Sequence, residues 1–186
     1  MLGALIAAIA YIESSRRKGA EVEAVSDARA RLLLPVPIAD LGAIEVAVSG
    51  TLHRFERDFA GIWFYHGVHA TAQPGHGHTV DAAVAQRIEH TFAALDRARM
   101  ERELKLDLHA GEYGVTTPRI ILLVYAKGAT QPLAQYAIGD VAPDGLSRYV
   151  LRVGSASVVT IATYQIDNLM NLIQSVSVSP LQPGKP

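Results

Sequence analysis

The chain has 186 residues and no cysteine, and its 17 basic and 18 acidic residues leave a net charge of -1 at neutral pH. Hydrophobic residues make up 49%, which is enough for one folded domain with its own core and too much for an intrinsically disordered chain. The charge balance argues against a nucleic-acid-binding protein, since such proteins carry a basic excess. The lack of cysteine excludes disulfides, zinc–thiolate sites, iron–sulfur clusters and thiol catalysis.

The N-terminal segment, residues 1–18, is predicted to be a membrane anchor. Residues 1–12 are nearly all apolar, and the basic cluster Arg16-Arg17-Lys18 follows them. A helix needs about 20 apolar residues to span a bilayer, so this run is too short to span alone. Three alternatives remain: the distal part of an anchor that begins upstream, a short anchor completed by a partner helix, or an amphipathic or buried helix of a soluble domain.

Residues 19–31 are predicted to be a linker, residues 32–174 a single domain, and residues 175–186 a proline-rich tail. The domain starts with Leu32–Pro37, whose two prolines exclude a helix interior. Alternation of apolar and polar residues then predicts three short strands in a meander. These strands cover residues 44–48, 52–57 and 61–65, and Trp63 is expected in the core.

An amphipathic helix is expected next, with Thr79 as its N-cap and Asp81 in its first turn. Its apolar residues recur at helical spacing and are Val80, Val84, Ile88, Phe92 and Leu95. The helix is expected to end near Arg99. Residues 101–108 alternate as an exposed strand would.

The C-terminal half is predicted to hold four strands and a last helix. Residues 120–125 are apolar on both faces, as in a central strand, and strands are also expected at 133–138, 148–153 and 158–161. Gly139-Asp140 and Pro143-Asp144-Gly145 are predicted to be structural turns. The last helix starts at Thr163, with Ile166, Leu169, Met170 and Ile173 on one face. The residues expected in the core are Trp63, Ile121, Leu123, Tyr149, Leu169 and Ile173.

The resulting fold class is α+β: antiparallel strand meanders with two amphipathic helices packed on one face, preceded by a short apolar N-terminal helix. No nucleophile elbow, zinc-protease motif, phosphate-binding loop or dinucleotide fingerprint occurs. We therefore predict a non-enzymatic protein with no catalytic residue and no bound cofactor. The basic residues Arg97, Arg99 and Arg102 form a local patch that could meet lipid headgroups, although a solvated face is the simpler interpretation.

Four of the seven histidines fall in one glycine-containing stretch. They are His66, His69, His76 and His78. Imidazole is the commonest metal ligand, and a glycine-rich loop can bring several rings to one zinc or copper ion. No carboxylate lies in the stretch before Asp81, and the spacing fits no closed zinc motif. The alternatives are a metal site, a solvated loop, which is favoured, and a loop that contacts a partner.

Several short segments together resemble a bacterial family of unknown function, number forty-three-forty, whose members are often encoded beside ABC transporters of the gliding-motility type. The segments are Gly61-Ile62-Trp63, Arg97-Ala98-Arg99, Tyr113-Gly114 with Pro118, Ile138-Gly139-Asp140 and Asp167-Asn168-Leu169. The resemblance implies a membrane-anchored extracytoplasmic protein and brings no catalytic residue with it. This chain departs from the family pattern by carrying one copy of the module and a short anchor.

We therefore expect an accessory or structural subunit of a larger membrane protein assembly, and the resemblance suggests an ABC-type transport system as that assembly. The resemblance implies a place at the bacterial inner membrane with the folded domain in the periplasm, and partners that are subunits of that assembly. The positive-inside rule applied to Arg16-Arg17-Lys18 favours the opposite orientation. The rival hypothesis is a periplasmic metal-binding or metal-delivery protein that uses the His66–His78 stretch.

Overall fold

The computed structural model describes residues 29–68, 81–106 and 110–177. The predicted anchor, most of the predicted linker and the tail beyond residue 177 lie outside this part of the chain. Among the residues described, no helix is long and apolar enough to cross a membrane. The predicted short N-terminal helix is therefore neither confirmed nor contradicted.

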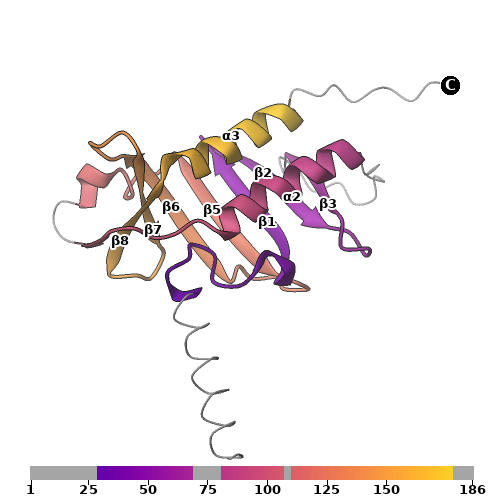
Figure 1. The fold of residues 1–186 in the computed structure, drawn as a ribbon, viewed down its shortest axis with the longest axis horizontal. Helices are drawn as coiled ribbons and strands as arrows, with labels where there is room; N and C mark the ends of the chain where they lie inside the picture. Colours follow the sequence, from indigo (N-terminus) through magenta and orange to yellow (C-terminus); the bar gives the residue numbers. More distant parts are fainter. Residues whose placement is uncertain (1–28, 69–80, 107–109, 178–186) are drawn as a thin grey trace, which may run out of the picture.

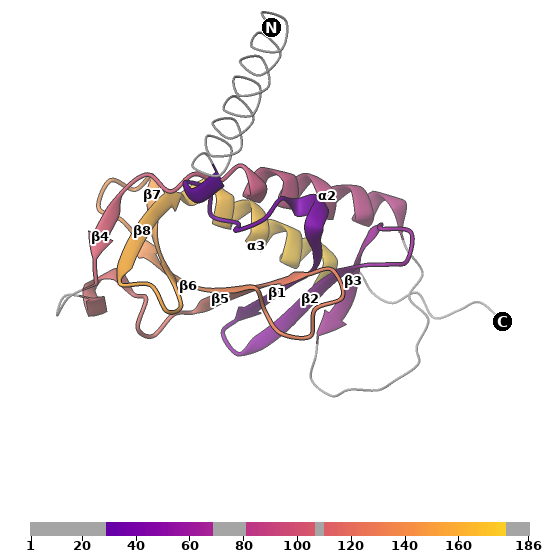
Figure 2. The ribbon, with the colours of Figure 1, turned by 90° about the horizontal axis from the view of Figure 1, so that it is seen from below.

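The described residues form one antiparallel sheet of eight strands in the order β3-β2-β1-β5-β6-β7-β8-β4. The strands are β1 (Leu41–Val48), β2 (Thr51–Arg57), β3 (Trp63–Val68), β4 (Glu103–Lys105), β5 (Ile120–Ala126), β6 (Ala134–Val141), β7 (Ser147–Arg152) and β8 (Ser157–Ala162). The helices are α2 (Ala82–Asp96) and α3 (Thr163–Ser177), with short 3-10 turns η1 (Ile38–Asp40) and η2 (Ala110–Tyr113). Both helices lie on one face of the sheet (Figures 1 and 2), so the predicted α+β class is confirmed.

Two meanders meet at the centre of this sheet. Strands β1, β2 and β3 form the predicted N-terminal meander, and strands β5 to β8 form the C-terminal one. The predicted central strand is β5, which pairs with β1 on one side and β6 on the other. The predicted strand after the first helix is the short β4, which pairs with β8 at the edge of the sheet.

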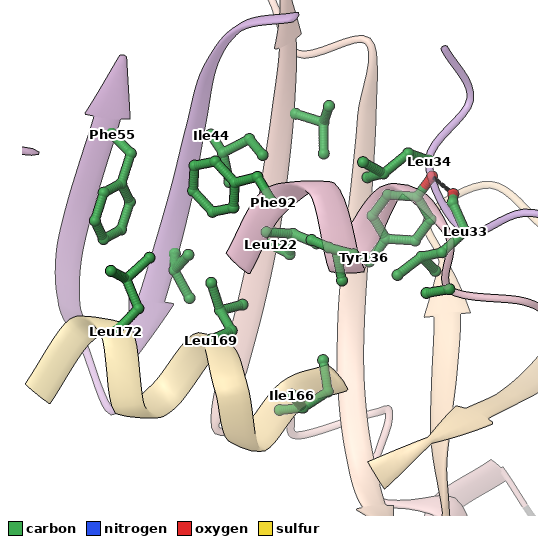
Figure 3. Packing of buried hydrophobic residues seen from close by; sticks show 14 of the residues in the cluster. Leu33, Leu34, Ile44, Phe55, Phe92, Leu122, Tyr136, Ile166, Leu169 and Leu172 are labelled. Carbon is green, nitrogen blue, oxygen red and sulfur yellow. Dashed lines mark hydrogen bonds between the residues drawn. The ribbon is translucent and has the colours of Figure 1, made fainter. Parts of the chain in front are cut away.

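The core lies between this sheet and the two helices (Figure 3). Helix α2 contributes Ile88, Phe92 and Leu95, and helix α3 contributes Ile166, Leu169, Leu172 and Ile173. From the sheet, Ile44, Phe55, Leu122 and Tyr136 face these helices. The predicted core residues Trp63, Leu169 and Ile173 are confirmed, and Trp63 packs edge-on against Phe92 with ring centroids 5.0 Å apart.

Three other predicted core residues are only half-buried and lie on the opposite face of the sheet. They are Ile121, Leu123 and Tyr149, and the residues that enter the core instead are their neighbours Leu122, Val124 and Val150. Side chains alternate between the two faces of a strand, so the predicted inward-facing positions are displaced by one residue along these strands. Both faces of β5 are apolar, and the sequence therefore does not say which face the helices cover.

The ends of the helices also differ from the prediction. Helix α2 is capped by Asp81, whose Oδ1 accepts hydrogen bonds from the backbone N–H groups of Ala83 (2.8 Å) and Val84 (3.1 Å). The proposed cap Thr79 lies outside the described residues. Helix α2 ends at Asp96 and helix α3 runs to Ser177, three residues past the predicted domain boundary at 174.

The segment before β1, residues 29–37, is folded onto the domain. Leu33 donates its backbone N–H to the Ala98 carbonyl (2.9 Å), and the Tyr136 hydroxyl donates to the Leu33 carbonyl. Leu34 is fully buried in the core, and Arg29 forms an ion pair with Asp96 at the end of α2. The domain therefore includes Arg29, which the sequence assigns to the linker.

Candidate functional site

The sheet has a second face, opposite the helices, which we call the open face. The part of the chain that the structure describes places no helix of the α type on it (Figure 2). The strand register aligns its side chains in rows that cross the sheet from strand to strand. One of these rows is apolar, and a network of charged and polar side chains lies beside it.

The apolar row crosses six strands and consists of Leu52, Ala47, Ile121, Ala137, Leu151 and Val158, each opposite the next in register. Ala137 and Val158 are buried, and the other members are half-buried. Leu123 lies on the same face of β5 as Ile121 and is also half-buried. Antiparallel sheets with one face in water normally carry polar residues on that face, so the composition of this row is unusual.

One end of the apolar row is covered by the end of η2 and by the residues that follow it. Tyr113 and Val115 pack with Ala137, Leu151 and Val158 in a small second cluster. The Tyr113 ring also lies against Tyr149, with centroids 4.7 Å apart. The other end of the row, over β2, β1 and β5, has no such cover from the described residues.

A charged network lies beside the uncovered end and connects four adjacent strands. The Tyr125 hydroxyl donates to Glu45 Oε2 (2.7 Å), and Arg54 Nη1 donates to Glu45 Oε1 (2.6 Å). Arg54 Nε donates to Glu56 Oε2 (2.6 Å), and His66 Nδ1 lies 2.9 Å from Glu56 Oε1. Donors and acceptors therefore alternate along this chain of side chains from β5 to β3. We call the five residues the ionic network: Tyr125, Glu45, Arg54, Glu56 and His66.

Two groups of the ionic network, Glu56 and Tyr125, have shifted pKa values. Burial raises the pKa of Glu56, but hydrogen bonds from Arg54 and His66 outweigh it and hold that pKa below its usual value. Burial and then the bond to Glu45 raise the pKa of Tyr125 to about 12, so this tyrosine stays protonated. The network therefore forms a fixed polar surface and contains no activated tyrosine nucleophile.

The predicted metal ligands are only partly within the described chain. His66 lies on β3 and joins the ionic network, whereas His69, His76 and His78 lie outside the described residues. In the described ranges, no group of three or more histidine, cysteine or acidic side chains could hold a metal ion. The metal hypothesis therefore stays a prediction.

The predicted turn at Pro143-Asp144-Gly145 is present between β6 and β7. The Asp144 carboxylate accepts hydrogen bonds from the backbone N–H groups of Leu146 (2.9 Å) and Ser147 (2.8 Å). These backbone hydrogen bonds hold the pKa of Asp144 below its usual value. Gly145 has a φ of 71°, which a side chain would disfavour.

The predicted turn at Gly139-Asp140 is wrong, because both residues belong to β6, where the register with β7 shifts between Ile138 and Val141. Gly139 does not have a left-handed backbone, and Asp140 is exposed and accepts no hydrogen bond from the described residues. A close approach of two chain segments explains the glycine. A Cβ on Gly139 would lie 2.1 Å from the Tyr113 carbonyl oxygen.

A second glycine completes this contact from the other side. Gly114 has a φ of 68°, and a Cβ there would lie 2.5 Å from Asp140 Oδ2. The two segments Tyr113-Gly114 and Gly139-Asp140, singled out separately in the sequence, thus pack backbone to backbone. We call this contact the glycine junction, and it holds Tyr113 and Val115 over one end of the apolar row.

A scan of protein-family models, a search of curated proteins and a search of solved structures found no match to this chain. The resemblance to the transporter-associated family therefore depends on the short sequence segments alone. The ionic network and the apolar row were not foreseen, because both depend on which strands are neighbours. Alternation in β1 and β2 was visible, but the pairing of β1 with β5 was not.

We predict that Gly139→Ala destabilises the domain by about 1–3 kcal/mol, the usual cost of overpacking. The added methyl group would force the Tyr113 carbonyl away from β6. Chemical denaturation monitored by circular dichroism measures the change. Gly111→Ala is the matched control, because a Cβ there meets nothing within 4 Å. Equal stability of the two variants would show that the glycine junction tolerates a side chain.

We predict that Glu56→Gln lowers the melting temperature at pH 7 and that this difference shrinks as the pH falls. A carboxyl whose pKa is lowered in the folded state stabilises that state above its usual pKa of 4.5 and loses the contribution on further acidification. Thermal melts from pH 7 to pH 3 measure the effect. Glu101→Gln, at an exposed position outside the ionic network, is the control. A difference that stays constant with pH would contradict the prediction.

Proposed function

We propose that this protein is a non-enzymatic module, tethered to a membrane by residues 1–18, that acts as an accessory or structural subunit of a larger membrane protein assembly. The open face is its docking surface for a partner subunit. The observation that carries the proposal is the uncovered end of the apolar row beside the ionic network.

The chemistry of the open face fits a protein partner. Leu52, Ile121 and Leu123 offer a half-buried apolar centre, and the ionic network supplies a polar border on one side. Protein interfaces have this anatomy, with an apolar core, a polar rim, and enrichment in arginine and tyrosine. Arg54 and Tyr125 are held in place before binding, which reduces the entropy lost on association.

The membrane part of the proposal comes from the sequence. Residues 1–12 are apolar, and the resemblance to the transporter-associated family implies a bacterial inner membrane and a periplasmic domain. An ABC-type transport system is the assembly that this resemblance suggests as partner. Deletion of residues 1–12 should move the protein from the membrane fraction to the soluble fraction while the domain stays folded.

We predict that Leu52→Lys/Ile121→Lys abolishes docking. A photo-reactive amino acid at Leu123 in the full chain should form one adduct in native membranes, and mass spectrometry should identify its partner as a subunit of a membrane complex. The double variant should lose that adduct because two charges would be buried at the interface. The matched control is Gln86→Lys/Asn171→Lys on exposed positions of α2 and α3. Adduct formation that the double variant and the control share would refute the open face as docking surface.

One observation favours the metal hypothesis as a second candidate. The Glu56 carboxylate holds Nδ1 of His66 at 2.9 Å. Metal-binding histidines commonly have their other ring nitrogen held by a carboxylate in this way. The remaining candidate ligands are His69, His76 and His78, and zinc or copper is the expected ion.

Calorimetric titration with zinc and with copper separates the two functions. The docking proposal predicts no tight binding of either ion by the full chain. Submicromolar binding that is lost in His76→Ala/His78→Ala, and weakened in Glu56→Gln, would establish the metal function in its place. His90→Ala, at an exposed position of α2, serves as the control.

A further inference from the structure

One end of the sheet collects most of the exposed apolar side chains. Because neighbouring strands are antiparallel, the β2–β3, β5–β6 and β7–β8 turns and the start of β1 all lie at the same end, the lower one in Figure 1. We call this end the turn edge. Figure 2 views the molecule from this side.

Five of the eight large hydrophobic side chains that are exposed among the described residues lie at the turn edge. They are Phe59 and Ile62 in the β2–β3 turn, Leu133 before β6, Val153 after β7, and Leu106, whose backbone N–H donates to Ala156 in the β7–β8 turn. Phe59 is fully exposed. An aromatic ring and aliphatic side chains that gather in exposed positions on successive turns indicate a surface that contacts a partner.

A groove opens on the helix side of the same end, between residues 29–37 and strands β6 to β8. Its volume is about 1090 Å³. Apolar side chains, among them Leu32, Met100 and Val159, line part of the groove. Three guanidinium groups also line it, from Arg29, Arg99 and Arg152.

Of the three arginines that line the groove, two have no acidic partner among the described residues. Arg29 is paired with Asp96. Arg99 and Arg152 are exposed and form no ion pair with any described residue. Glu103 is the carboxylate that lines the same groove. An apolar lining with guanidinium groups suits a molecule that combines a hydrocarbon part with an anionic head, since guanidinium binds phosphate in a two-pronged geometry.

We propose that the turn edge rests on a membrane surface and that the groove binds the phosphate headgroup of an anionic phospholipid between Arg99 and Arg152. The exposed turn residues enter the interface beside it, where aromatic and aliphatic side chains are favourable. The described chain begins at Arg29, on the wall of the groove, so the predicted anchor is joined to the domain at this edge. The proposal adds a lipid-binding site to the membrane tether of the proposed function. It rests on that tether only for the orientation of the domain on the membrane.

The natural chain has no cysteine, so a single introduced cysteine can carry an environment-sensitive fluorophore without side reactions. The full chain is labelled at Phe59→Cys on the turn edge, or at Leu146→Cys on an exposed turn at the opposite end of the sheet. Each is mixed with vesicles of phosphatidylcholine alone or with added phosphatidylglycerol. We expect a blue shift, and quenching by lipid-borne quenchers, only for the Phe59 label and chiefly in the phosphatidylglycerol vesicles.

The groove is tested by adding Arg99→Gln/Arg152→Gln to the chain labelled at Phe59→Cys. We expect this variant to lose the additional blue shift that phosphatidylglycerol causes. The control Arg87→Gln/Arg119→Gln removes the same charge from exposed positions elsewhere and should keep that additional shift. Glycerol 3-phosphate in solution should compete weakly, because it lacks the hydrocarbon part.

Three outcomes would overturn the proposal: equal emission from the two labels, a shift that ignores phosphatidylglycerol, or a shift that survives Arg99→Gln/Arg152→Gln. Full competition by glycerol 3-phosphate would show that the groove binds soluble anions and would likewise overturn it. Failure of the tether gives a different result. The full chain would then sediment with phosphatidylglycerol vesicles but not with phosphatidylcholine vesicles.

Discussion

The pairing of β1 with β5 is the contact on which the rest of this structure depends. It joins two meanders that are separated along the chain by helix α2 and strand β4, and it makes one sheet of them. On the helix face, it places Val124 beside Ile44 and Leu122 beside Val46, which are fully buried. On the open face, the same register places Ile121 beside Ala47, and the Tyr125 hydroxyl reaches Glu45. Without this pairing, the edges of β1 and β5 that face each other would leave backbone N–H and C=O groups without ladder partners.

The two faces of the sheet therefore have different roles. The helix face carries the stability of the domain, because α2 and α3 bury their apolar side chains there. The open face keeps a half-buried apolar row and a network of paired charges, which contribute less to folding and are suited to recognition. The turn edge adds a third surface, where apolar turn residues lie near two arginines that form no ion pair with a described residue. In the function that we propose, these surfaces place the module between a bilayer and a protein partner.

The glycine junction shows how a local sequence signal can have a cause that is not local. Gly139 looks like a turn residue in the sequence, since an aspartate follows it and a proline-containing turn comes soon after. Its backbone is extended within β6, and its lack of a side chain allows the backbone of Tyr113 to pack against it. Gly114 does need its left-handed backbone, and it also makes room for Asp140. Both glycines are needed by the same contact, which covers one end of the apolar row.

The sequence by itself determined the elements of this fold: the alternating strands, the two amphipathic helices, the Pro143-Asp144-Gly145 turn and the α+β class. These follow from periods and turn residues within a short stretch of chain. Only the tertiary structure decided which face of β5 is the core, because both of its faces are apolar and a one-residue change of phase exchanges them. Only the tertiary structure also shows why residue 139 is a glycine and which side chain His66 contacts. Those depend on segments far apart in the chain, and no local period carries information about which segments become neighbours.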